Sequence, residues 1–84
     1  MSKLSERINI GKVLESNLNS VGIESYEDLT KLGSEEAFLK LQMFGHDPCM
    51  NTLCALEGAI EGIRWHDLPK EKKENLKLFF KSTK

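Results

Sequence analysis

The sequence predicts an all-α fold, and three observations carry this expectation. Apolar residues recur at helical spacing along the chain, and no segment alternates with the two-residue period of a strand. Gly, Asn and Pro residues separate the periodic stretches, as expected of turns between helices. The chain has 84 residues, which is the length of one small domain, so we assign residues 1–84 to a single compact domain of about five short helices.

In the first half of the chain, short helices alternate with tight turns. A short helix is expected over about residues 2–8, followed by a turn at residues 9–11 and a helix over about residues 11–20 that stops at Gly22. Ser25 is the expected N-cap of a short helix, with Asp28 at the third helical position. Ser34 is the expected N-cap of the next helix, whose buried face extends to Phe44. The apolar stripe of the 11–20 helix comprises Ile10, Val13, Leu14, Leu18 and Val21.

In the second half, the most apolar helix is expected over about residues 48–63, with Asp47 as N-cap and Pro48 as its first residue. One buried stripe begins at Cys49, and a second stripe of small residues contains Gly58 and Gly62, which predicts that another helix packs closely there. Trp65 is expected to close the core. The last helix follows Asp67 as N-cap, runs to about residue 81, and exposes Lys70, Lys72, Lys73, Lys77 and Lys81.

The charge is unevenly distributed although the formal net charge is only −1. Residues 1–12 carry a net charge of +2, residues 13–62 hold two lysines against nine acids, and residues 63–84 carry a net charge of +4. This pattern is compatible with a polar partner or with a solvated surface of mixed charge, and it differs from that of a strongly basic nucleic-acid binder. Because the chain has neither a secretory signal nor an apolar run near the ~18 residues of a membrane span, we expect a cytoplasmic bacterial protein without a membrane partner.

The chain offers few groups for catalysis. His46 and Cys49 have the spacing of half a metal site, but Cys54 would point away from Cys49 on a helix, and zinc needs about four ligands. His66 and Asp67 are adjacent and therefore poorly placed to form a catalytic pair. No phosphate-binding loop motif is present. We therefore expect no metal, no cofactor and no catalytic residues, and hence no enzyme.

The turn at residues 9–11 is the one local feature with a binding mechanism. A short helix, the turn and a second helix form a helix–hairpin–helix-like pattern, which suggests a helix–hairpin–helix or SAM-like fold. Backbone N–H groups of the turn and of the following helix would face outward and hold a phosphate, helped by the helix dipole. The alternative is a packing unit without a nucleic-acid role. The candidate nucleic-acid-binding residues are Asn9, Ile10, Gly11, Lys12, Arg7 and Lys3.

Three stretches resemble the C-terminal domain of the TfoX/Sxy competence regulators. They are NIGKVLE (residues 9–15), GSEEAF (residues 33–38) and ALEGAIEGIRWHDLP (residues 55–69), and the likeness extends over about residues 8–80. The resemblance implies a helical domain related to helix–hairpin–helix folds, an association with the regulation of DNA uptake, and no enzymatic activity. Full-length regulators of this kind carry a further N-terminal domain, so we expect a stand-alone C-terminal domain here.

Two functions remain open at this point. The first is a non-enzymatic regulatory module with weak, non-specific nucleic-acid binding through the hairpin. The second is a protein–protein interaction domain, which includes the formation of a homodimer, with no nucleic-acid role. Binding to phosphates weakens steeply with salt, whereas an apolar interface does not, so salt dependence separates the two.

Overall fold

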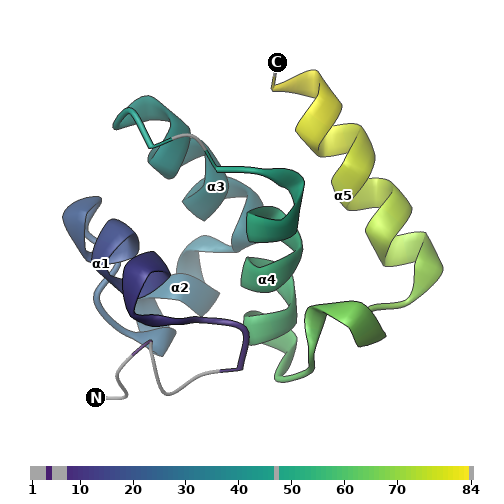
Figure 1. Ribbon diagram of the computed structural model, residues 1–84, viewed down its shortest axis with the longest axis horizontal. Helices are drawn as coiled ribbons and strands as arrows, with labels where there is room; N and C mark the ends of the chain where they lie inside the picture. Colours follow the sequence, from purple (N-terminus) through teal and green to yellow (C-terminus); the bar gives the residue numbers. More distant parts are fainter. Residues whose placement is uncertain (1–3, 5–7, 47, 84) are drawn as a thin grey trace.

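Five α-helices and a short 3₁₀ helix make up the computed structural model, which describes residue 4, residues 8–46 and residues 48–83 (Figure 1). Within these residues there is no β-strand, and the predicted all-α fold is confirmed. The structure measures 31 × 27 × 20 Å. The helices are α1 (Lys12–Ser20), α2 (Tyr26–Leu32), α3 (Ser34–Met43), α4 (Met50–Glu61), η2 (Trp65–Asp67) and α5 (Lys70–Ser82).

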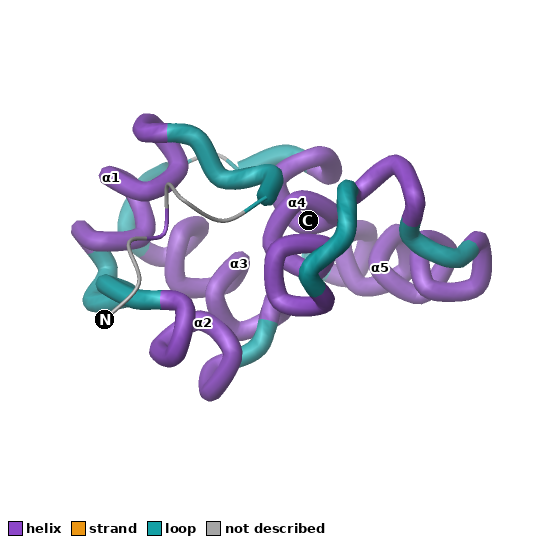
Figure 2. Tube along the Cα trace, turned by 90° about the horizontal axis from the view of Figure 1, so that it is seen from below, coloured by secondary structure: helices purple, strands orange, loops and turns teal. Residues whose placement is uncertain are grey.

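Helix α4 is the centre of the packing, because it contacts α2, α3, α5 and η2. It can do so because most of its surface is apolar or small: Leu53, Leu56 and Ala59 are at most 1% exposed. Figures 1 and 2 agree that α5 lies on one side of α4, whereas α1 and α2 lie on the other. The predicted short helix over residues 2–8 lies largely outside the described residues.

Phe38 of α3 links α5 to the core. Its side chain is fully buried, and the rings of Phe79 and Phe80 meet it edge-on with centroid distances of 6.2 and 5.7 Å. Edge-to-face pairs of this kind add about 0.5–1.5 kcal/mol to the burial of the rings. Helix α5 is therefore anchored by Leu76 and by two aromatic rings on one side, and its other side faces solvent.

The helix ends confirm two predicted boundaries and correct one. The Ser25 hydroxyl accepts a hydrogen bond from the Asp28 N–H (3.1 Å), so the predicted N-cap of α2 is confirmed. Gly22 follows the end of α1 with a φ of 89°, as predicted. Ser34, however, is the first residue of α3 rather than its N-cap, a position that Gly33 occupies. The Ser34 hydroxyl is directed to α4, where it donates to the carboxylate of Glu57 (2.7 Å).

The last two helices begin later than predicted. Helix α4 starts at Met50, because Cys49 is extended (ψ 177°) and takes the N-cap position. Cys49 is also exposed rather than part of a buried stripe. The predicted cap Asp47 lies outside the described residues. Asp67 is not the N-cap of α5, because it belongs to η2 and Leu68 before Pro69 is extended, as the proline ring favours.

Two side chains that were predicted to be buried are exposed. Val13 is 77% exposed because Leu14 and Leu18, four residues apart, take the inward side of α1, and Val13 lies about 100° from that side. Phe44 is 62% exposed. Helix α3 ends at Met43, so the helical phase that predicted an inward Phe44 no longer applies there.

The two glycines of α4 have different roles. Gly62 is the left-handed residue (φ 77°) that ends the helix, and no atom of a neighbouring segment lies within 4 Å of its Cβ position. Gly58 is where the close approach occurs. A Cβ there would lie 2.5 Å from the Nδ2 of Asn9 and 2.8 Å from the carbonyl oxygen of Ile63. The predicted close packing is correct for Gly58 but not for Gly62, and the neighbour is a pair of loop segments rather than a helix.

We predict that Gly58→Ala destabilises the protein by about 1–2 kcal/mol, because the added methyl group overpacks the contact with residues 9 and 63. In an open helical position the same change would stabilise by up to about 1 kcal/mol. The sign of the change in the urea midpoint therefore tests the contact. A midpoint equal to or above that of the wild type would show that the site has room for a side chain.

Candidate binding surface at the α1 N-terminus

The turn before α1 is fixed to the end of α4 by the side chain of Asn9. Its Nδ2 donates to the carbonyl oxygen of Ile63 (2.9 Å), and its Oδ1 accepts from the N–H of Trp65 (3.2 Å). The backbone of Asn9 is left-handed (φ 72°), a conformation that asparagine tolerates better than most residues. Ile10 is only 4% exposed. The side chains of these two candidate residues thus face the interior and position the turn.

Gly11 and Lys12 form the outward part of the candidate site. Gly11 is the exposed N-cap of α1 and provides no side-chain cap, and Lys12 is the exposed first helical residue. A helix N-terminus carries a partial positive charge, so an anion is favoured at this end. Glu15 lies in the first turn of α1, and its negative charge opposes the binding of an anion there. The other two candidates, Lys3 and Arg7, lie outside the described residues.

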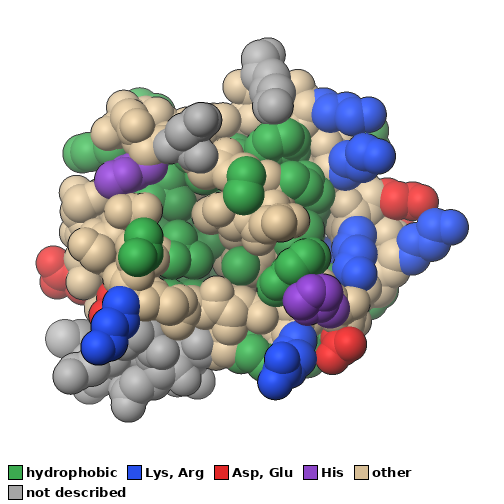
Figure 3. All heavy atoms as spheres, in the orientation of Figure 1, with side chains coloured by type: hydrophobic (Ala, Val, Ile, Leu, Met, Phe, Trp, Pro, Cys, Tyr) green, Lys and Arg blue, Asp and Glu red, His purple; other side chains and the backbone are tan. Residues whose placement is uncertain are grey.

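A groove of about 660 Å³ opens beside this helix end. Its residues come from the turn before α1, from α1, from α3, from the loop before α4, from the first half of α4 and from η2. Figure 3 shows hydrophobic side chains gathered in the middle of this face, with other side chains around them. The lining residues are Asn9, Gly11, Lys12, Val13, Leu14, Asn17, Leu41, His46, Pro48, Asn51, Thr52, Ala55 and Trp65.

Sequence reasoning missed most of this groove. Asn17 and Asn51 contribute amide groups from α1 and α4, and His46 contributes an imidazole whose Nε2 lies 3.0 Å from the Ser20 hydroxyl. Asn17 is about 30 positions from His46 and Asn51 in the sequence, and the three share no motif, so no local pattern predicts that they meet. The only signal was the break at residues 45–48, which places a loop between two buried helices.

Trp65 lies at the other boundary of the groove. It is partly buried against the core, as predicted, and its indole stacks on the imidazole of His66 with a centroid distance of 3.9 Å. The described residues contain no group of three or more His, Cys, Asp or Glu side chains that could hold a metal ion. The arrangement favours recognition of a ligand or partner, by an open apolar floor with polar edges, over chemistry on a substrate.

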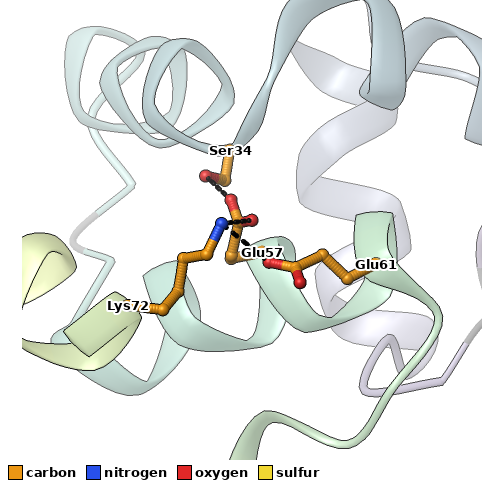
Figure 4. A network of polar contacts seen from close by, with 4 residues as sticks. All are labelled: Ser34, Glu57, Glu61 and Lys72. Carbon is orange, nitrogen blue, oxygen red and sulfur yellow. Dashed lines mark hydrogen bonds and ion pairs between the residues drawn. The ribbon is translucent and has the colours of Figure 1, made fainter. Parts of the chain in front are cut away.

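A second polar cluster joins α3, α4 and α5 (Figure 4). The ammonium group of Lys72 lies 3.2 Å from a carboxylate oxygen of Glu57 and 3.1 Å from one of Glu61. Ser34 donates to the other oxygen of Glu57. The four side chains satisfy one another, so the cluster fastens three helices together and does not present a free reactive group. Lys72, predicted to be exposed, is therefore turned toward α4.

The two carboxylates of this cluster are shifted in opposite directions. Burial raises the pKa of Glu57, but hydrogen bonds with Glu61, Ser34 and Lys72 outweigh burial and leave the pKa below its ordinary value. The hydrogen bond with Glu57 raises the pKa of Glu61, against the opposing effect of Lys72. The hydrogen bonds to Glu61 and Glu57 raise the pKa of Lys72.

We predict that Glu57→Gln lowers stability at neutral pH by at most about 1 kcal/mol, because it removes the charged acceptor shared by Ser34 and Lys72. The contribution of Glu57 is present above the ordinary carboxyl pKa of 4.5 and is lost as the pH falls through its lowered pKa. The difference between wild type and variant in the free energy of unfolding, measured with urea, should therefore shrink as the pH falls below 4.5.

The matched control for this prediction is Glu61→Gln, which changes the other carboxylate on the same lysine. It should be neutral or slightly stabilising at neutral pH, because it removes a like charge from beside Glu57. Equal losses for both variants would contradict the assignment of Glu57 as the structural carboxylate.

The two cysteines should differ in reactivity, because only Cys54 is buried in the structure. Cys49 is exposed, and a hydrogen bond with Thr52 lowers the pKa of its thiol, whereas burial raises the pKa of the Cys54 thiol. We expect a disulfide reagent to modify one thiol quickly in the native protein and the second only on unfolding. Cys49→Ser should remove the fast phase alone; a fast phase that persists in this variant would reverse the assignment.

These features define a class of protein: a small all-α domain with an open groove between its helices. More particularly, the TfoX C-terminal domain family matches residues 1–80, and the chain belongs to that family. The family is a regulatory rather than an enzyme family, and the domain is of the kind found in competence regulators. The resemblance expected from the sequence is thereby confirmed.

Two crystal structures from Listeria monocytogenes are similar to this chain. The first is a triclinic form of an uncharacterized protein, with 49% sequence identity, a TM-score of 0.95 and coverage of 98% of this chain and 93% of that one. The second is a tetragonal form of a protein of unknown function, with 49% identity, a TM-score of 0.94 and coverage of 98% and 100%. No curated protein matches the chain. The described part of the chain contains no helix that is long and apolar enough to span a membrane.

Proposed function

We propose that this chain is a non-enzymatic regulatory module that associates weakly with nucleic acid in the bacterial cytoplasm. The observation that carries the proposal is the α1 N-terminus, where the N-cap Gly11 and the first helical residue Lys12 are both exposed. This positive end precedes residues 13–62, which carry a net negative charge. Asn9 supports it by holding the turn in one conformation, so little entropy is lost when an anion binds. Membership of the TfoX C-terminal domain family supports a regulatory role connected with DNA uptake.

The binding would be electrostatic and without sequence preference. The N–H groups of a helix end and one lysine contact phosphate oxygens, which carry no base information. The net charge of −7 over residues 13–62 repels a polyanion. An affinity in the range of about 10⁻⁴–10⁻⁶ M is therefore expected, with a salt dependence that is shallower than that of a strongly basic nucleic-acid binder, because few phosphates are contacted, but steeper than that of an apolar interface.

A second candidate function is supported by the groove itself. Its floor is apolar, and Val13 at its edge is 77% exposed, which suits a side chain of a protein partner better than a phosphate. On this alternative the chain is a protein–protein interaction or homodimerisation domain. Such binding would change little with salt, because it rests on apolar contact.

We predict that Lys12→Glu weakens the binding of every duplex sequence alike, because a phosphate contact has been removed and a repulsive charge added. The measurement is an NMR titration of the labelled protein with two unrelated short duplexes at low salt. Amide shifts should cluster on residues 9–13. If these amides do not shift, and a protein partner remains bound at high salt, the result favours the protein–protein interaction domain.

A further inference from the structure

The exposed side of α5 carries a line of lysines that the proposed site does not use. Lys70, Lys73, Lys77 and Lys81 follow one another at intervals of three or four residues, so they lie on one side of the helix. From the first to the last they span about 16 Å along the helix axis. Lys70, Lys77 and Lys81 are exposed, and Lys73 is half-buried. Figure 3 shows Lys and Arg side chains gathered along the edge that α5 forms.

This lysine line is not consumed by internal ion pairs. The two salt bridges found among the described residues both involve Lys72, which points to α4 from another side of α5. In the lysine line, only the side chain of Lys73 makes a hydrogen bond within the described part of the chain, by donating to the carbonyl oxygen of His66 (2.8 Å). That contact leaves its charge uncompensated. Glu74 lies beside the line on the same helix and reduces its net charge by one.

Most acidic groups of the described residues lie away from the lysine line, although Glu71 and Glu74 are on α5 itself and Asp67 is in η2. Glu35, Glu36 and Glu57 line a depression with Lys72 and Asn75, which belong to the side of α5 away from the lysine line. Figures 1 and 2 place α1 and α2 at the end of the molecule opposite α5. The acids on α1 and α2 are therefore separated in space from the lysine line, and at physiological salt a distance of more than about 8 Å largely screens them from a ligand at α5.

We propose that the lysine line of α5 is a contact surface for the phosphate backbone of duplex DNA. The inference deepens the proposed function and rests on its nucleic-acid association, but it places a second contact on another face. A straight row of single positive charges complements the regular row of negative charges along a nucleic-acid strand. Lysines contact phosphates as point charges without the planar fork that reads a base, so this surface binds without sequence preference.

The test compares charge variants by fluorescence anisotropy with a labelled duplex at about 50–200 mM salt. If about four phosphates are neutralised, the affinity of the wild type should fall on the order of 100-fold across this range. Lys77→Gln/Lys81→Gln removes two contacts, so the fall should shrink to about tenfold. Glu74→Gln should bind more tightly than the wild type, because it removes the acid beside the line.

The matched control is Lys31→Gln/Lys40→Gln, which makes the same change in net charge on α2 and α3. It should keep the salt dependence of the wild type. Circular dichroism checks that every variant is folded. If the control and the α5 variant lose affinity equally, only net charge matters and the α5 surface is wrong.

Two further arms separate the possible failures. If Lys12→Glu abolishes all duplex binding and Lys77→Gln/Lys81→Gln binds as the wild type does, the proposed function is retained and the α5 surface is rejected. The absence of duplex binding by the wild type at low salt would reject both. A competition with poly-L-glutamate at equal charge tests whether the surface prefers DNA. If poly-L-glutamate competes as well as unlabelled DNA, the partner is an acidic protein and the assignment to DNA is wrong.

Discussion

The absence of a side chain at Gly58 is the constraint on which the arrangement of this domain depends. Only a bare helix surface allows Asn9 and the segment after α4 to lie against the same turn of the helix. The two hydrogen bonds of the Asn9 side chain then join residues that are more than 50 positions apart in the sequence. They set the direction from which the chain enters α1, and with it the position of the candidate anion site. The same contact brings Trp65 to the boundary of the groove.

Helical spacing and turn residues predicted the fold class well, because both signals are local. The Ser25 cap and the glycine after α1 follow from chemistry within a few residues, and the structure shows both. Ser34 was misassigned because its hydroxyl has a partner on another helix, Glu57, which no local rule includes. Phe44 was misassigned because the exact end of α3 decides which way it points. In the first case a tertiary contact overrode the local capping preference. In the second case the helix ends one residue before Phe44, so the helical periodicity no longer applies to that side chain.

The candidate site was only partly predictable for the same reason. The tight turn and the helix after it are visible in the sequence, since Asn9 and Gly11 favour that geometry. That Asn9 turns its side chain inward could not be foreseen, because its partners lie beyond the end of α4. The groove is built from three stretches of the chain, residues 9–17, residues 41–55 and Trp65, and it becomes apparent only when α1 and α4 are placed beside each other.

The attachment of α5 has a consequence for the order in which the protein opens. This helix packs through one face, on the ring of Phe38 near its C-terminus and on α4, where Lys72 of its first turn pairs with Glu57 and Glu61. Its other face is exposed to solvent, so we expect its backbone amides to exchange through a partial opening that leaves the contact at Gly58 intact. A ligand that requires α5 to be docked would close that opening and slow the exchange, by an amount set by its concentration relative to its dissociation constant. The C-terminal helix is thus the part of the domain whose stability depends most on what the protein has bound.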